Sequence, residues 1–193
     1  MEIVKNMSEY LTDQLCKEHI ILKENKELYE YGFQITIANI VNAIIVVSVG
    51  ILGAAPVSML LFYFIFVSLR FFCGGYHAKT YAKCFLLFGL TCTVELFAGR
   101  WLSNMNIQIL AGTLLFAFAG LGFCIYKWAP IEHENKVLSS SERKQFRRCS
   151  QAVYIFWVLM AVILILIKQI HYIGYFSAAL SLVTIFMIIE KRR

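Results

Sequence analysis

The stretch Arg70-Phe-Phe-Cys-Gly-Gly-Tyr-His-Ala-Lys-Thr-Tyr-Ala-Lys-Cys84 separates two long apolar segments of the chain. The segment before it runs from about residue 57 to 73, and the segment after it from 84 to 99. Each is close to the length that an α-helix needs to cross ~30 Å of hydrocarbon at ~1.5 Å per residue. The polar stretch is therefore predicted to link two membrane-spanning helices.

Four more apolar segments lie on either side of this pair, near residues 35–52, 107–126, 151–167 and 172–189. The 193 residues are 60% hydrophobic and 16% charged, with a mean hydropathy of +0.68. A soluble domain of this size could not bury so much apolar surface, whereas lipid can solvate it. We expect an all-α, polytopic integral membrane protein with about six transmembrane helices.

The first 34 residues are polar, but apolar side chains recur among them at helical spacing, as at Ile3, Met7 and Leu11. This pattern predicts an N-terminal amphipathic helix lying on the membrane surface. A soluble helix packed on the cytoplasmic face fits the same pattern equally well.

We expect one membrane domain over residues 1–193. Its parts are the N-terminal region (1–34), two spans (35–73), a loop (74–83), spans three and four (84–126), a basic loop (127–150), and the last two spans with a tail (151–193).

The positive charges predict the orientation of the chain. With the N-terminus inside, all 18 Lys and Arg residues except Arg100 and Lys168 fall in inside segments. Cytoplasmic loops of membrane proteins carry such an excess. Both termini and the 74–83 loop are therefore expected to face the cytoplasm.

The central stretch carries a candidate nucleophile, Cys84, and a candidate general base, His77. Cysteine attacks carbonyl groups as the thiolate, and a neighbouring imidazole commonly produces it. Cys84 opens the third span, near the positive end of that helix's dipole. Lys79 and Lys83 are close in sequence, and His77 can form an ion pair with the thiolate.

The spacing of the pair constrains the backbone. Seven residues of straight helix separate two side chains by ~10 Å, whereas a catalytic hydrogen bond needs roughly 3 Å. Residues 75–83 therefore cannot form one continuous helix with Cys84 if the pair is catalytic. Gly74 and Gly75 are suited to break the chain there.

Other interpretations of these residues remain open. His77 fits an interfacial polar residue in a loop, and Cys73, His77, Cys84 and His133 could be metal ligands, although they lack zinc-finger spacing. We expect no metal and no cofactor. Cys73, Cys92 and Cys124 sit in apolar runs and are expected to be small buried hydrophobes.

Arg70 ends the second span, where it fits either a snorkelling anchor or a carboxylate-binding residue. The basic loop has an ordinary explanation in topology and contact with anionic lipid. Glu95 is the one acid inside an apolar segment, and we expect it to pair with Arg100 or to bond across a helix interface.

The pattern Arg70 … Gly74-Gly75-Tyr76-His77-Ala78 … Cys84 resembles the signature of the AgrB family (accessory gene regulator B), membrane cysteine endopeptidases of Gram-positive quorum-sensing systems. The run Ala129-Pro130-Ile-Glu-His-Glu-Asn135 is similar to that family's cytoplasmic loop. Chain length and number of spans agree, so the resemblance covers essentially the whole chain.

The resemblance implies a partner, AgrD, with an amphipathic leader, a short core and an acidic C-terminal tail. The nucleophile, Cys84 by position, would cut between core and tail with His77 as base and hold the core as a thioester. A core Cys or Ser would then close a cyclic thiolactone or lactone peptide. The residues expected to bind or position this substrate are Arg70, Gly74, Gly75, Lys79, Lys83, Arg143, Lys144, Arg147 and Arg148.

The resemblance also implies a bacterial cell-membrane location and a homodimer. Small residues from Ala111 to Gly122 offer a close-packing helix face, which packing within one chain explains equally well. No nucleic-acid partner is expected. The alternative function is a non-enzymatic peptide exporter or transporter subunit in which Cys84 is dispensable, although we find neither paired intramembrane charges nor inverted repeats.

Overall fold

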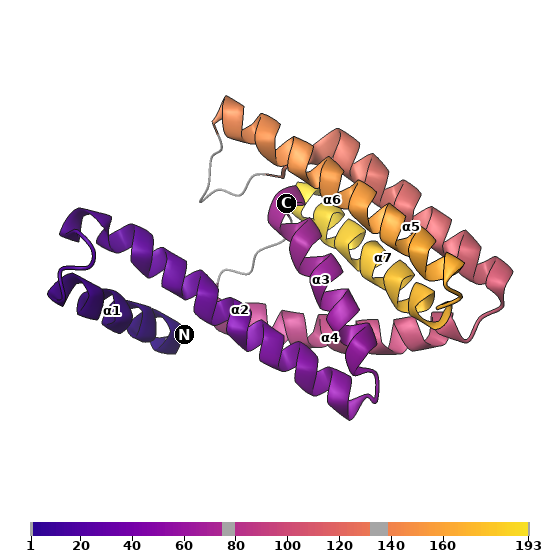
Figure 1. Cartoon of the computed structure of the whole chain (residues 1–193), viewed down its shortest axis with the longest axis horizontal. Helices are drawn as coiled ribbons and strands as arrows, with labels where there is room; N and C mark the ends of the chain where they lie inside the picture. The colour runs from indigo at the N-terminus through magenta and orange to yellow at the C-terminus, as the bar shows by residue number, and fades with distance from the viewer. Residues whose placement is uncertain (1, 75–79, 132–138, 193) are drawn as a thin grey trace.

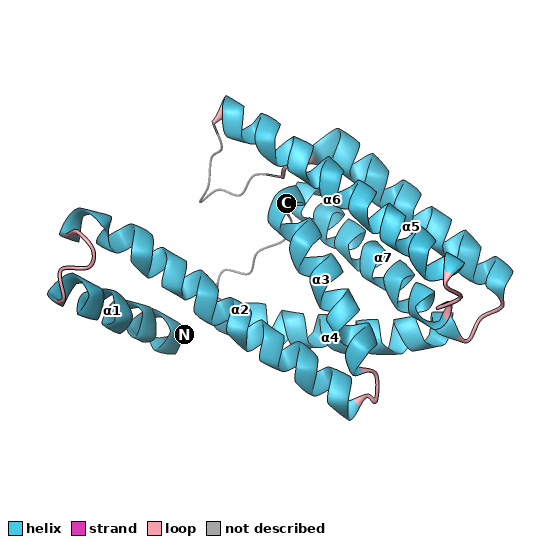
Figure 2. Ribbon diagram, in the orientation of Figure 1, coloured by secondary structure: helices cyan, strands magenta, loops and turns pink. Residues whose placement is uncertain are grey.

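A computed structural model describes residues 2–74, 80–131 and 139–192 (Figures 1 and 2). Within those ranges the chain forms helices and loops and no strand. The helices are α1 (Glu2–Lys17), the short 3-10 turn η1 (Lys23–Asn25), α2 (Lys26–Leu52), α3 (Pro56–Cys73), α4 (Tyr81–Ser103), α5 (Ile107–Trp128), α6 (Ser140–Leu166) and α7 (His171–Arg192).

The six helices α2 to α7 of the described chain are long and apolar enough to cross a membrane, and each overlaps one of the predicted segments. The fold class is therefore confirmed: the chain is an all-helical, multi-pass membrane protein. Two helices start more than two turns before their apolar segments, α2 at Lys26 and α6 at Ser140. Polar first turns extend α2 and α6 beyond the apolar stretch because Lys, Glu, Gln and Arg are good helix formers.

The last helix, α7, lies at the centre of the bundle (Figure 1). Every residue from Ile173 to Leu180 is buried, so this part of α7 is enclosed on all sides. Small residues let its neighbours approach: Gly99 of α4 lies against the Tyr175 ring, and Gly174 lies against Ser103. Close backbone contacts of this kind stabilise helix pairs in lipid, where hydrophobic burial drives association weakly.

The outer faces of the spans remain apolar and exposed, as at Leu52 (88% exposed) and Phe116 (80%). Lipid is the solvent for these surfaces. One polar contact joins two spans: the Trp157 indole N–H of α6 donates to the Ser68 hydroxyl of α3 at 2.9 Å.

Helix α1 packs along the first half of α2, outside the main bundle (Figure 1). Ser8 and Thr12 are fully buried there, and their hydroxyls donate to carbonyls of α1 itself at 2.8 Å. An ion pair of 2.6 Å joins Asp13 to Lys26 of α2. On the other side, Ile3 (72% exposed) and Tyr10 (63%) leave an apolar face uncovered. The helix is amphipathic as expected, and its place on the membrane surface stays a prediction.

The helix ends form two groups. We call one end of the bundle the Cys84 end. There, the backbone N–H of Ile131, which follows α5, donates a hydrogen bond to the Cys73 carbonyl of α3, and Arg70 of α3 contacts Phe186 of α7. At the opposite end, Arg100 of α4 donates to the Gly53 carbonyl and Ser103 donates to that of His171. Among the described residues, the segments between helices that were predicted to lie on one side of the membrane therefore lie at one end of the helix bundle.

Candidate active site

Cys84 lies in the first turn of α4. Thr80 caps this helix in an extended conformation, and its hydroxyl oxygen accepts from the Lys83 backbone N–H at 3.3 Å. The Cys84 N–H donates to the Thr80 carbonyl at 2.9 Å. The helix that carries Cys84 begins at Tyr81, and Thr80 before it is extended rather than helical. The half-buried thiol is thus placed at the N-terminal end of the helix.

Gly74 ends α3 in a conformation that only glycine adopts readily, with φ +78° and ψ −168°. A Cβ here would collide with the Ile131 carbonyl oxygen. The Ile131 N–H donates to the Cys73 carbonyl at 2.9 Å, which ties the segment after α5 to the end of α3. Gly74 therefore lets the start of the 74–83 loop lie against the first part of the basic loop (127–150).

Three predicted site residues, Gly75, His77 and Lys79, lie outside the described residues, as do His133 and Lys136. The role of His77 as general base stays a prediction. Lys83 is exposed and adjacent to Cys84 along the helix, and side chains at adjacent helical positions do not face each other.

Arg70 lies in the last turn of α3, and its guanidinium stands over two rings, at 5.4 Å from the centre of Phe66 and 5.5 Å from that of Phe186. It is also within electrostatic range of Cys84 and of Glu190 on α7. Arg70 of α3 and Cys84 of α4 thus lie at the same end of the bundle, near enough to interact electrostatically.

No sequence pattern pointed to α7 as part of the site, yet Phe186 and Glu190 lie one turn apart at its Cys84 end. The available signal was an acid directly after the last apolar segment.

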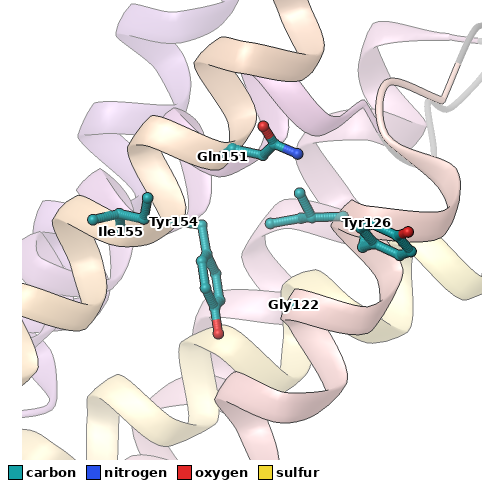
Figure 3. Close-up of a pocket in the computed structure, with 6 residues that line it drawn as sticks. Gly122, Tyr126, Gln151, Tyr154 and Ile155 are labelled. Atoms are coloured by element: carbon teal, nitrogen blue, oxygen red, sulfur yellow. The ribbon is translucent and has the colours of Figure 1, made fainter.

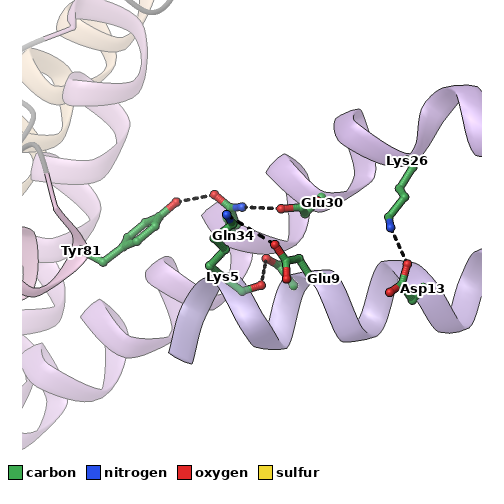
Figure 4. Close-up of polar contacts among 8 residues, drawn as sticks. Lys5, Glu9, Asp13, Lys26, Glu30, Gln34 and Tyr81 are labelled. Carbon is green, nitrogen blue, oxygen red and sulfur yellow. Dashed lines mark hydrogen bonds and ion pairs between the residues drawn. The ribbon is translucent and has the colours of Figure 1, made fainter. Parts of the chain in front are cut away.

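Tyr81 fixes the first turn of α4 against α2. Its hydroxyl donates to Gln34 Oε1 at 2.9 Å, and Gln34 Nε2 donates to Glu30 Oε1 at 3.1 Å (Figure 4). These hydrogen bonds connect the first turn of α4 to the polar part of α2, just before its apolar segment. They therefore help to fix the position of Cys84 along the axis of α2.

Four predicted substrate-binding cations lie on the exposed first part of α6: Arg143, Lys144, Arg147 and Arg148. Ser139 begins this helix with a capping box closed by Glu142. Arg147 also donates to the Tyr126 carbonyl of α5 at 2.7 Å. Phe146 packs on Phe72 of α3, with ring centres 6.2 Å apart, so these cations lie at the Cys84 end.

A cavity of about 300 Å³ lies between α5 and α6, lined by Gly122, Tyr126, Gln151 and Tyr154 among others (Figure 3). No residue of α4 lines it, so it is separate from Cys84. Among the described residues, no group of three His, Cys, Asp or Glu side chains is arranged to hold a metal.

Glu95 is fully buried in α4, and neither of its carboxyl oxygens has a hydrogen-bond partner within the described residues. Both expectations for Glu95 are therefore wrong within the described residues: it bonds neither to Arg100, which donates to the Gly53 carbonyl, nor across a helix interface. As expected, Cys73, Cys92 and Cys124 are buried among the spans.

Comparison with known proteins gives a consistent result. The family model described as accessory gene regulator B matches residues 8–189. An AgrB-like protein of Clostridium perfringens (strain SM101 / Type A) is 26% identical over 171 residues, which cover 84% of this chain and 78% of that protein. AgrB-like protein 2 of C. perfringens (strain 13 / Type A) is 25% identical over the same shares. No solved structure matches.

Proposed function

Because the chain belongs to the accessory gene regulator B family, we propose that it is the membrane cysteine endopeptidase of a quorum-sensing system. Its substrate would be an AgrD-like precursor with an acidic C-terminal tail. The enzyme would remove that tail and release the core as a cyclic thiolactone or lactone peptide.

The placement of Cys84 is the observation that supports this proposal most. Cys73, Cys92 and Cys124 are buried inside spans, whereas Cys84 is half-buried in the first turn of a helix, close to Arg70. A helix N-terminus and a nearby cation both stabilise a thiolate. Cys84 therefore has the surroundings that a nucleophile needs at the edge of a membrane.

In the proposed reaction, the Cys84 thiolate attacks the carbonyl carbon between core and tail. Collapse of the tetrahedral intermediate breaks the C–N bond, and the leaving amine takes a proton from protonated His77. The core is then held on Cys84 as a thioester. Attack by a core thiol or hydroxyl, which gives its proton to His77, forms the ring and returns the Cys84 thiolate.

The exposed cations of α6 would bind the acidic tail of the precursor. Arg143, Lys144, Arg147 and Arg148 lie at the Cys84 end, and guanidinium groups pair with carboxylates in bidentate fashion. Within this proposal, both termini and Cys84 face the cytoplasm of a bacterial cell. Assembly as a homodimer stays a prediction.

The proposal is tested with purified protein in liposomes and a precursor made of an amphipathic leader, a Cys-containing core and an acidic tail. We expect Cys84→Ser and His77→Ala to abolish cleavage detected by mass spectrometry, and Cys73→Ser and Cys92→Ser to retain it. Cleavage by Cys84→Ser at the wild-type rate would refute the peptidase function.

A further inference from the structure

An open apolar groove of about 440 Å³ lies between α1, α2 and the first turn of α4. Its lining includes Met7 of α1, Ile37 and Ile40 of α2, and Tyr81, Ala82 and Phe85 of α4. The groove therefore joins the amphipathic helix, the first span and the helix that carries Cys84.

The groove is adjacent to Cys84. Tyr81 precedes Cys84 by three residues, a separation at which helical side chains are neighbours at about 5–6 Å between Cβ atoms. Phe85 is the next residue along the helix, and both Tyr81 and Phe85 line the groove. An extended peptide advances by about 3.5 Å per residue. A peptide acylating Cys84 would thus bring its last one or two side chains to the groove.

A polar network begins at one of the residues that line this groove. The Tyr81 hydroxyl donates to Gln34, and Gln34 donates to Glu30 (Figure 4). Peptide N–H and C=O groups at the membrane edge need polar partners, whereas a lipid acyl chain does not. An apolar lining that includes a hydrogen-bonded Tyr81 therefore suits a peptide.

We propose that this groove binds the apolar side chains of the one or two precursor residues that directly precede the cleaved bond. The proposal rests on the peptidase function proposed above and assigns α1 a part in substrate selection. The groove would orient the scissile carbonyl by holding the acyl half of the substrate on the α2 side of Cys84.

The test uses the full chain in nanodiscs and two reagents that alkylate cysteine, with loss of chloride and formation of a thioether. They are the chloromethyl ketones of acetyl-Phe-Phe and acetyl-Gly-Gly. The labelling rate of Cys84 is divided by that of Cys16, a half-buried cysteine of α1 that does not line the groove, to correct for partition into lipid. We expect the Phe-Phe reagent to be favoured at least about ten-fold, as apolar pockets achieve.

The matched variants are Ile40→Trp, which fills the groove, and Ile51→Trp, at a lipid-facing site of the same helix; the native side chains are 55% and 65% exposed. Ile40→Trp should remove most of the preference, Ile51→Trp should retain it, and iodoacetamide should label Cys84 equally in both. Equal rates for the two reagents, or a preference that survives Ile40→Trp, would overturn the assignment of the groove. Either result would leave the peptidase function standing if Cys84→Ser still abolishes precursor cleavage.

Discussion

Among single residues, Gly74 and Cys84 determine the geometry of the site from opposite sides of the central loop. Gly74 ends α3 in close contact with the Ile131 carbonyl, and Cys84 lies in α4 one turn after the N-cap residue Thr80. Arg70 adds a cation held between the rings of Phe66 and Phe186. Gly74 and Arg70 each contact a residue from a different helix or loop, Ile131 and Phe186 respectively.

Replacement of Gly74 tests this geometry. Gly74→Ala places a Cβ against the Ile131 carbonyl oxygen at φ +78°, and backbone strain of this kind costs on the order of 1–3 kcal/mol. We expect a lower thermal unfolding temperature in nanodiscs and slower cleavage of the precursor. Gly112→Ala is the matched control, because nothing lies within 4 Å of its Cβ and alanine favours the helix by about 1 kcal/mol. Equal behaviour of the two variants would contradict the contact between Gly74 and Ile131.

The sequence predicted the number and the approximate positions of the membrane-spanning helices. The six apolar runs correspond to six candidate spans, and α3 ends directly before Gly74, a residue predicted from the sequence to break the chain. The extended starts of α2 and α6 could not be predicted, because an apolar count stops where polar residues begin although the helix continues. Ser8 and Thr12 are buried where α1 packs on α2, although polar residues of this kind are expected on a surface. The packing of α1 on α2 was therefore not predictable from the sequence.

We expect the contact between α1 and α2 to depend on pH through the ion pair of Asp13 and Lys26. A hydrogen bond from Lys26 lowers the pKa of Asp13 below its ordinary 3.8. A lowered carboxyl pKa means that the contact is complete above pH 3.8 and is lost as the pH falls through the folded-state value. We expect spin labels at positions 10 and 29 to show a broader distance distribution on such acidification.

Two variants separate this contact from general effects of acid. Asp13→Asn should show the broad distribution already at neutral pH. Glu9→Gln removes a pair that lies within α1, Lys5–Glu9, and should behave as wild type. A narrow distribution for Asp13→Asn at neutral pH would show that the ion pair does not hold α1 in place.

In the whole molecule, the site is assembled by helices that are far apart in sequence. The sequence predicted Arg70, Cys84 and the cations of α6 as candidate site residues, but it could not show that Arg70 contacts Phe186 of α7. Contacts of that kind depend on how the spans pack, and apolar runs of similar composition do not specify their order in space. The fold class followed from composition, whereas the neighbours of each site residue required the structure.

The grouping of helix ends predicts the accessibility of introduced cysteines. Lys144→Cys lies at the Cys84 end and Gln169→Cys at the opposite end, and both sites are exposed. In a background without native cysteines, a membrane-impermeant maleimide should label position 144 only in inverted vesicles and position 169 only in right-side-out vesicles. The reverse pattern would place Cys84 outside the cell.

The central claim is that Cys84 carries the precursor core as a thioester. Its most direct test is intact-mass analysis of wild-type protein quenched with acid during precursor cleavage, followed by peptide mapping. We predict an adduct with the mass of the precursor without its tail, located on Cys84, released by hydroxylamine and absent from Cys84→Ala. Precursor cleavage by wild-type protein with no adduct on Cys84, or with an adduct that persists in Cys84→Ala, would contradict the account.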